Sequence, residues 1–235
     1  MAVIYWAGDS TVKQNGVATY PQTGIGQVFH RYLRPDVRVE NHAENGRSTK
    51  SFLDEGRLAP IYDRMRAGDF LFVQFGHNDE KREDPARYTQ PRGTFSQNLA
   101  CFVNAAANRQ AHAVFITPLT RLRFGDPPAP YDHRPYREAM LETARRLLVP
   151  CIDLCAMSEA LVTRLGAEKS GVFYMQLPAG VYARYPQGLM DGTHLRPEGA
   201  LVFGGLIARG LYDLGGAYAA LLADGYDPQT ACPFL

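Results

Sequence analysis

Ala2-Val3-Ile4-Tyr5-Trp6-Ala7 is a continuous apolar run, and it stops at the polar turn Gly8-Asp9-Ser10. An uninterrupted apolar run of this kind is typical of a parallel strand that other layers cover on both faces. The pattern recurs along the chain, and we predict a sheet built from all of these runs. The predicted strands are Ala2 to Ala7, Val37 to Asn41, Phe70 to Phe75, Ala113 to Thr117 and Cys151 to Leu154.

Helical patterns, in which apolar residues recur three and four positions apart, lie between and after these runs. Strands that alternate with helices predict a parallel sheet with helices on both faces, which is a three-layer α/β/α sandwich. No composition break, low-complexity linker or internal repeat divides the chain, so we predict a single domain over residues 1–235. The predicted helices are Phe95 to Asn108, Tyr136 to Leu148, Ser158 to Leu165 and Pro197 to Leu211.

The composition excludes several classes of protein. With 46% hydrophobic and 11% aromatic residues, a chain of 235 residues can bury a full core, which excludes a disordered protein. Lys and Arg number 25 and Asp and Glu number 24, so the formal net charge is +1. This balance gives no electrostatic basis for binding nucleic acid or an anionic membrane, and no apolar run approaches the roughly 18 residues of a membrane span. We therefore expect neither partner, and the oligomeric state stays open.

The cysteines and the N-terminus point to a cytoplasmic protein. Cys101, Cys151, Cys155 and Cys232 are too few and too scattered for a disulfide scaffold, and no second Cys/His pair lies at zinc-ligand spacing. We expect them to be buried or bystander thiols. The first residues contain no basic segment and too short an apolar stretch for a signal peptide. Secretion stays open if a leader has been lost.

Two segments carry residues for nucleophilic catalysis. A serine at the end of a parallel strand, as Ser10 is, lies at the carboxyl edge of the sheet near backbone N–H donors. Asp191 lies three residues before His194, and an aspartate so placed can orient a histidine that takes the proton of the serine. Ordinary structure explains both segments as well. Gly8-Asp9-Ser10 is common turn composition, and Asp191 could form an Asx turn before the helix at Pro197.

Two further segments follow the second and third predicted strands. In Asn45-Gly46-Arg47-Ser48, the glycine lets a backbone N–H approach a ligand closely. In Gly76-His77-Asn78-Asp79, the Asn78 amide could donate to a developing oxyanion. A serine, a glycine, an asparagine and a histidine therefore emerge in this order from successive strand ends, an arrangement that chance does not explain.

These four blocks resemble those of the SGNH (or GDSL) hydrolases, a superfamily of flavodoxin-like α/β/α esterases. Longer matches narrow the resemblance to the rhamnogalacturonan acetylesterase group of carbohydrate esterases. The resemblance spans the chain from Val3 to Leu211. The longer matching segments are Phe75 to Pro85, Thr117 to Phe124 and Tyr185 to Leu195.

The resemblance implies a role for each matched residue. Ser10 would attack the acetyl carbonyl, His194 would take and return its proton, and Asp191 would orient His194. The oxyanion would be held by the backbone N–H groups of Ser10 and Gly46 and by the side chain of Asn78. The implied substrate is an acetylated oligosaccharide or polysaccharide, and we expect neither a metal nor another cofactor.

Two long connections are candidates for substrate binding, since long loops in compact domains are often functional. Gly76 to Thr94 is crowded with charged residues, which are also typical of a solvated surface. Gly171 to Arg196 carries aromatic rings of the kind that stack on sugars when they are exposed beside a cleft. These rings are Phe173, Tyr174, Tyr182 and Tyr185.

Four residues complete the predicted site as candidate substrate contacts. His77 lies within a matched block, so the resemblance implies that it lines the site, where it could position Asn78 through a hydrogen bond or contact the substrate directly. Pectic substrates carry galacturonate carboxylates, with which Arg121 or Arg123 could pair, although solvated arginines are common. Tyr185 comes from the aromatic connection described above.

Three hypotheses of function are consistent with the sequence. The first is a serine acetylesterase that removes O-acetyl groups from rhamnogalacturonan through an acyl-enzyme. The second keeps this chemistry but changes the substrate to acetylxylan, a lipid or a thioester, because the fold does not choose the leaving group. The third is a sugar-binding module without catalysis, which predicts a broken set of catalytic residues.

Overall fold

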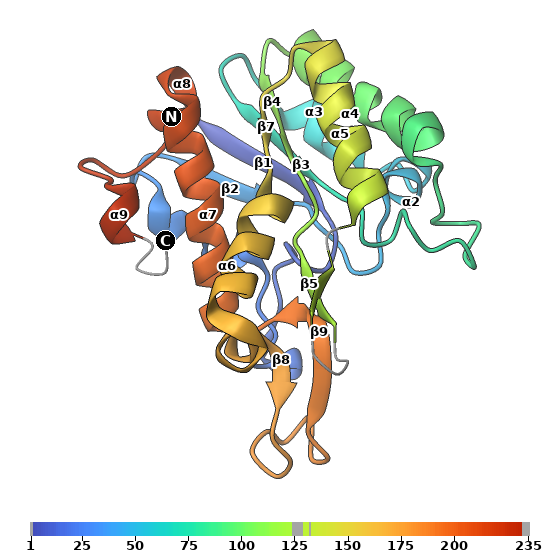
Figure 1. Ribbon diagram of the computed structural model, residues 1–235. Coiled ribbons are helices and arrows are strands. Elements are labelled where there is room, and N and C mark those ends of the chain that lie inside the picture. Colours follow the sequence, from blue (N-terminus) through green and yellow to red (C-terminus); the bar gives the residue numbers. More distant parts are fainter. Residues whose placement is uncertain (1, 124–128, 132, 232–235) are drawn as a thin grey trace.

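A parallel sheet forms the centre of the computed structural model, which describes residues 2–123, 129–131 and 133–231 (Figure 1). Its strand order is β2-β1-β3-β4-β7, and every neighbouring pair is parallel. The five predicted strands all lie in this sheet, which confirms the predicted fold. The strands are β1 (Val3–Gly8), β2 (Arg38–Asn41), β3 (Phe70–Gln74), β4 (His112–Ile116) and β7 (Cys151–Ile152).

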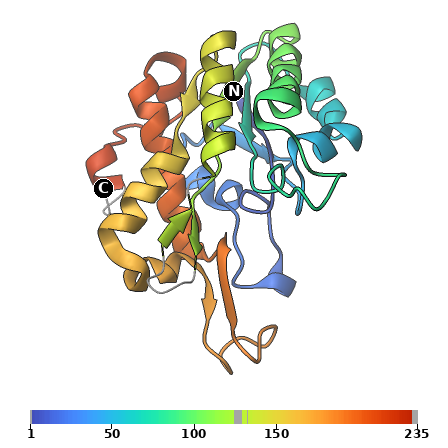
Figure 2. The same cartoon turned by 45° about the vertical axis from the view of Figure 1, so that its right-hand side comes forward.

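Helices cover both faces of the sheet and make three layers, as Figures 1 and 2 show. Successive side chains of a strand point to opposite faces, so Ile4 and Trp6 pack in one core cluster and Tyr5 and Ala7 in the other. The first cluster contains residues of α1 (Ile25–Val28), α6 (Leu154–Ser170) and α7 (Pro197–Leu214). The second contains residues of α2 (Thr49–Asp54), α3 (Leu58–Arg64), α4 (Ser96–Asn108) and α5 (Arg134–Leu147).

Aromatic packing fixes β1 in the sheet. Trp6 is fully buried and meets the rings of Phe29 and Phe72 edge-on, with centroids 5.0 and 5.3 Å away. Burying a large apolar side chain stabilises a fold by about 2 to 3 kcal/mol, and edge-to-face ring pairs add to this. The turn that follows β1 therefore starts from a rigid position.

The predicted helices are confirmed, with one marked difference in length. The helices α4, α5 and α7 begin within two residues of the predicted positions. The last strand, however, ends at Ile152, and α6 already begins at Leu154 rather than at Ser158. Asp153 causes this early start, because its side chain accepts the N–H of Ala156 and its carbonyl accepts that of Met157.

The connection from Gly171 to Arg196 is a β-hairpin rather than the predicted loop. Its strands β8 (Tyr174–Leu177) and β9 (Leu189–Leu195) are antiparallel, and Figure 2 shows the hairpin projecting from the body of the molecule. Phe173 and Tyr174 belong to the core, so these two rings are not exposed for sugar stacking. A second small antiparallel sheet pairs β5 (Arg121–Arg123) with β6 (Ala129–Tyr131).

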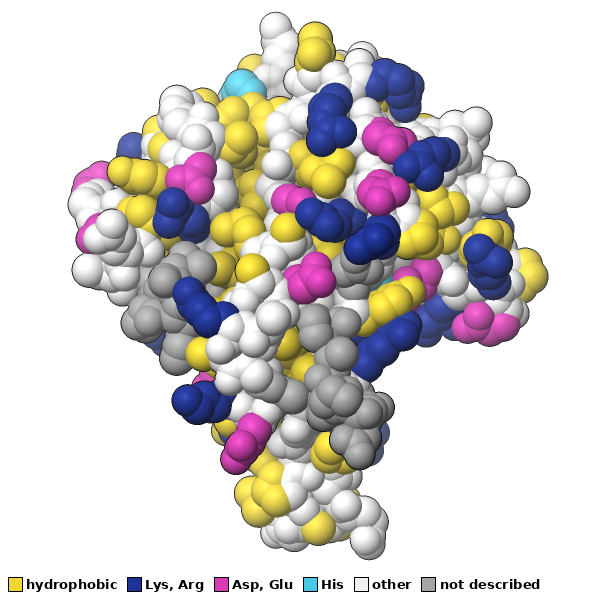
Figure 3. Space-filling view, in the orientation of Figure 1, with side chains coloured by type: hydrophobic (Ala, Val, Ile, Leu, Met, Phe, Trp, Pro, Cys, Tyr) yellow, Lys and Arg dark blue, Asp and Glu magenta, His cyan; other side chains and the backbone are white. Residues whose placement is uncertain are grey.

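The remaining features lie at the surface and the C-terminus. Basic and acidic side chains are interspersed on the face that Figure 3 shows, without a continuous basic stripe. Among the described helices, none is long and apolar enough to cross a membrane. Cys101 is exposed, Cys151 is partly buried and Cys155 is buried, and Cys232 lies outside the described residues. The short helices α8 (Gly216–Ala219) and α9 (Pro228–Ala231) follow α7.

Candidate active site

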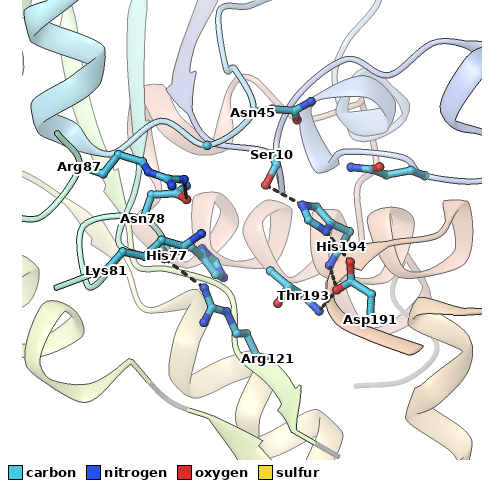
Figure 4. Close-up of a pocket in the computed structure, with 12 residues that line it drawn as sticks. Ser10, Asn45, His77, Asn78, Lys81, Arg87, Arg121, Asp191, Thr193 and His194 are labelled. Carbon is cyan, nitrogen blue, oxygen red and sulfur yellow. Dashed lines mark hydrogen bonds and ion pairs between the residues drawn. The ribbon is translucent and has the colours of Figure 1, made fainter. Parts of the chain in front are cut away.

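A pocket of about 530 Å³ lies at the carboxyl edge of the sheet, where the sequence predicts the site (Figure 4). Segments that follow β1, β2 and β3 contribute to its lining, and β5 and β9 complete it. The structure brings the predicted Ser10, Gly46, His77, Asn78, Arg121, Asp191 and His194 together in this lining. Gln22, Asn45, Lys81, Arg87 and Thr193 line the pocket as well and were not predicted as site residues.

A chain of hydrogen bonds joins Ser10, His194 and Asp191. The Ser10 Oγ atom lies 2.9 Å from Nε2 of His194, and Nδ1 of His194 lies 2.6 Å from Oδ2 of Asp191. Asp191 also accepts the backbone N–H groups of Thr193 and His194 on Oδ1. Partial burial works against its charged form, but the hydrogen bonds from Thr193 and His194 and the electrostatic interaction with the His194 ring hold the pKa of Asp191 below its usual value.

The ionised Asp191 fixes the tautomer of His194. A carboxylate only accepts hydrogen bonds, so Nδ1 of His194 carries the proton in this contact. The lone pair of Nε2 then faces Ser10 and accepts the hydroxyl proton. This is the protonation pattern that a general base next to a nucleophile requires.

The hairpin positions Asp191 and His194 over Ser10. Both residues are on β9, which is tied to the body by the N–H of Thr23 donating to the carbonyl of Leu195 at 2.8 Å. Gly192 lies against β5 so closely that a Cβ atom there would be 1.8 Å from the carbonyl oxygen of Leu122. Only glycine allows this approach.

Three residues with available N–H donors line the pocket at Ser10. Gly46 has φ +73°, a left-handed conformation that favours glycine, and within the described residues no acceptor faces its N–H or that of Ser10. The Asn78 amide donates one hydrogen to the carbonyl of Arg47 at 3.1 Å, and its oxygen accepts from Arg87 at 3.4 Å. Its second N–H hydrogen is left for the pocket, so the three groups can act together as an oxyanion hole.

A buried hydrogen bond between His77 and Asp9 connects two of these segments. His77 Nδ1 lies 3.2 Å from Asp9 Oδ2, and both side chains are excluded from solvent. Burial opposes the charged form of Asp9, but His77 and the hydrogen bonds from Thr11 hold its pKa below the usual value. Because Asp9 precedes Ser10 and His77 precedes Asn78, this contact fixes the two functional segments relative to each other.

The other predicted substrate contacts have different surroundings. Arg121 lines the pocket but is already bound to the Glu80 carboxylate at 2.8 Å and to the carbonyl of His77 at 3.0 Å. Arg123 lies over the ring of Tyr131 at 3.6 Å and lines an adjoining depression of about 590 Å³. Tyr185 pairs with Tyr182 between β8 and β9 and does not belong to the described lining.

The charged run after β3 is not simply a solvated surface. Asp79 is fully buried and accepts hydrogen bonds from the backbone and hydroxyl of Thr49 and from the hydroxyl of Thr89. The Glu80 carboxylate is largely enclosed and contacts Arg121 and His133. Only part of the run, Arg82 and Glu83 included, is exposed.

Asp79 gives the protein a measurable pH dependence of stability. Burial raises the pKa of Asp79 to about 7, although the hydrogen bonds from Thr49 and Thr89 oppose this. Since the folded-state pKa lies above the unfolded value, the stabilising contribution is complete below about pH 4 and is lost as the pH rises to 7. We expect the unfolding free energy of the wild type, relative to Asp79→Asn, to fall by up to about 4 kcal/mol over this interval.

Urea unfolding of both proteins between pH 4 and pH 8 tests this expectation. Because the difference between the two proteins is followed, any constant cost of the substitution cancels. Asp63→Asn, which removes an exposed carboxylate, serves as the matched control and should give a flat difference. A flat difference for Asp79→Asn would contradict the assignment.

Comparison with known proteins shows which family this chain resembles. The profile of the GDSL-like lipase/acylhydrolase family matches residues 7–201. A rhamnogalacturonan acetylesterase of Bacillus subtilis is 39% identical over 214 residues, which are 90% of each chain. A probable rhamnogalacturonan acetylesterase of the same organism is 38% identical over 90% of this chain and 93% of its own. The crystal structure of the Bacillus subtilis protein YxiM superposes with a TM-score of 0.76 at 25% identity, covering 91% of this chain and 57% of that longer chain.

Proposed function

Because the chain belongs to the GDSL-like lipase/acylhydrolase family and is an esterase, we propose that it removes O-acetyl groups from rhamnogalacturonan-derived oligosaccharides or polysaccharides. The observation that carries the proposal is the unbroken series of hydrogen bonds from the Ser10 hydroxyl through His194 to Asp191, beside the three N–H donors of the pocket. An intact series of hydrogen bonds of this kind also argues against a sugar-binding module without catalysis. The names of the two curated relatives support the choice of sugar.

The first half of the proposed reaction acylates Ser10. As the Ser10 oxygen bonds to the acetyl carbonyl carbon, Nε2 of His194 takes the hydroxyl proton and the carbonyl oxygen becomes an oxyanion. The N–H groups of Ser10, Gly46 and Asn78 stabilise that charge, and Asp191 stabilises the imidazolium. The bond to the sugar oxygen then breaks, and His194 gives its proton to that departing oxygen, which leaves as the sugar hydroxyl.

The second half releases acetate by the same route. Water donates a proton to Nε2 of His194 as its oxygen attacks the acetyl-Ser10 carbonyl. The same donors hold the new oxyanion, and its collapse breaks the bond to the Ser10 oxygen. His194 gives the proton back to that oxygen, which regenerates the starting enzyme.

The lining of the pocket favours a short acyl group on a polar alcohol. None of its described members is an aliphatic or aromatic hydrophobic residue. A long acyl chain gains affinity by burying its methylene groups, at about 0.8 kcal/mol each, and finds no apolar wall here. An acetyl group has one methyl to bury, while the hydroxyls of a sugar can bond to the polar side chains.

A comparison of substrates tests the proposed function. Acetate release is measured on acetylated rhamnogalacturonan oligosaccharides and on acetylated xylo-oligosaccharides, and acyl preference on 4-nitrophenyl esters from two to eight carbons. We expect the highest kcat/KM on the rhamnogalacturonan set and a decline with acyl length. A preference for xylan fragments would replace the sugar assignment, and a preference for eight carbons would overturn the acetylesterase proposal.

Replacing Asn78 by alanine should lower kcat by about 10²- to 10³-fold, the usual cost of one oxyanion-hole donor. KM should change little, because the donor acts on the charge that develops in the transition state. Asn104→Ala, which removes an exposed asparagine of α4, is the matched control and should keep wild-type kcat. If Asn78→Ala raised KM at unchanged kcat, the side chain would be a substrate contact instead.

A further inference from the structure

Cationic side chains gather on one wall of the pocket. Lys81, Arg87 and Arg121 belong to the lining, whereas Asp191 is its one carboxylate among the described residues. Figure 4 shows the three cations on the side of Asn78 and His77, across the pocket from His194 and Asp191. The charge of Asp191 is already engaged with His194. The opposite wall therefore carries the positive charge of the site.

Two of these three cations have partners within the protein. Arg121 binds the Glu80 carboxylate at 2.8 Å. Burial opposes the charged form of Glu80, but His133 and Arg121 hold the pKa of Glu80 below its usual value. Arg87 forms an ion pair with Asp84 and also contacts the Asn78 oxygen. These arginines are thus held in place, and each charge is balanced nearby.

Lys81 differs from both arginines. Its backbone is anchored in the turn after Asn78, because its N–H donates to the Asn78 carbonyl at 3.3 Å and its carbonyl accepts the N–H of Asp84 at 3.0 Å. Its side chain is half-buried and lines the pocket. Within the described residues, however, its ammonium group has neither a carboxylate nor a carbonyl partner. One positive charge of the pocket wall is therefore left for a ligand.

We propose that the Lys81 ammonium group, with Arg87 on the same wall, binds a carboxylate of the sugar chain whose acetyl ester is cleaved at Ser10. The proposal rests on the proposed function, since it names the acidic part of the same substrate. The acetyl group is uncharged, so the anion belongs to the alcohol side of the ester. One unbalanced positive charge matches one uronate carboxylate, and its half-buried position reduces screening by salt.

The subsite makes Lys81 a specificity-determining residue rather than a catalytic one. Its link to the N–H donors is a backbone hydrogen bond to the Asn78 carbonyl, and within the described residues its side chain is not bonded to Ser10, His194 or Asn78. Its contribution is expected in the choice between acidic and neutral sugars. A hydrogen bond to a charged group typically changes binding by about 10- to 100-fold.

The test compares two forms of one substrate. Acetylated rhamnogalacturonan oligosaccharides are used as such and after reduction of their galacturonate carboxylates to neutral alcohols. The ratio of the two kcat/KM values is measured for the wild type and for Lys81→Gln, so that any general effect on catalysis cancels. We expect the wild type to prefer the acidic form and Lys81→Gln to lower this preference about 10- to 100-fold. Lys81→Arg should restore most of the preference.

Arg82→Gln is the matched control, because it removes a neighbouring positive charge that is exposed and outside the pocket lining. It should keep the wild-type ratio. Equal ratios for the wild type and Lys81→Gln would overturn the subsite while leaving the proposed function intact.

Failure of the proposed function gives a different result. If neither oligosaccharide releases acetate, unacetylated oligogalacturonate is tested as an inhibitor of 4-nitrophenyl acetate hydrolysis. Inhibition of the wild type that weakens about 10-fold or more in Lys81→Gln supports the carboxylate subsite on its own. Inhibition that is absent, or equal in both proteins, overturns it.

Discussion

We expect Ser10→Ala to lower kcat for acetate release by on the order of 10⁶-fold, the usual loss when a nucleophile that acts together with a base is removed. The reason is that Ser10 Oγ is the atom 2.9 Å from the His194 base, and no acyl-enzyme can form without it. His194 and the oxyanion donors stay in place in the variant. The residual rate then measures what these groups achieve with water alone.

Two measurements separate this chemical loss from a folding defect. The urea midpoint of Ser10→Ala should match that of the wild type, since Ser10 lies in a turn and, within the described residues, its hydroxyl bonds to His194 alone. Mass spectrometry after rapid quenching should find an acetylated peptide containing Ser10 in the wild type and none in the variant. Ser96→Ala, which removes a hydroxyl of α4, controls for the loss of a serine elsewhere. Substantial turnover by folded Ser10→Ala would show that another group is the nucleophile.

Replacing Asp191 by asparagine should lower kcat about 10⁴-fold. The substitution preserves the shape of the side chain but puts a hydrogen-bond donor where the carboxylate is an acceptor. A carboxylate oxygen at Oδ2 accepts the Nδ1 proton of His194 over 2.6 Å. An amide nitrogen at the same place donates to Nδ1 instead and moves the histidine proton to Nε2. The lone pair that should accept the Ser10 proton is then lost.

The loss of activity in Asp191→Asn should extend across the pH profile. The ionised Asp191 also supports the imidazolium, so the variant should lose rate over the whole range in which the wild type is active. Asp213→Asn, an exposed position on α7, should keep wild-type activity. A loss below 10-fold for folded Asp191→Asn would mean that another group orients His194.

The sheet and the residues that follow its strands could be predicted because both depend on local sequence. A continuous apolar run indicates a buried parallel strand, and parallel strands end at one edge, so Ser10 and Asn78 follow from the strands that precede them. The pairing of β8 with β9 could not be predicted in this way. The connection between β8 and β9 is long. In the sequence Tyr174 is an isolated aromatic residue, and its burial depends on the tertiary structure.

The charged run after β3 shows a second limit of sequence reasoning. Whether a charged side chain is solvated depends on partners that lie far along the chain. The Glu80 carboxylate is enclosed because Arg121 and His133 contact it. The Asp79 carboxylate is buried because the Thr49 hydroxyl donates a hydrogen bond to it. Lys81 belongs to the same run and faces the pocket without such a partner. Three neighbouring charges thus have three different environments, which their sequence does not distinguish.

The placement of Asp191 and His194 on one hairpin has a consequence for how the enzyme can fail. The aspartate and the proposed base form a preassembled unit, since their 2.6 Å contact lies within a single strand. Among the described side-chain contacts, the 2.9 Å contact to Ser10 joins that unit to the turn after β1. A small displacement of the hairpin, such as a side chain at Gly192 would force, therefore separates base from nucleophile while the sheet and its helices stay intact. Catalytic activity therefore depends on the position of one hairpin, so the enzyme can lose activity without unfolding.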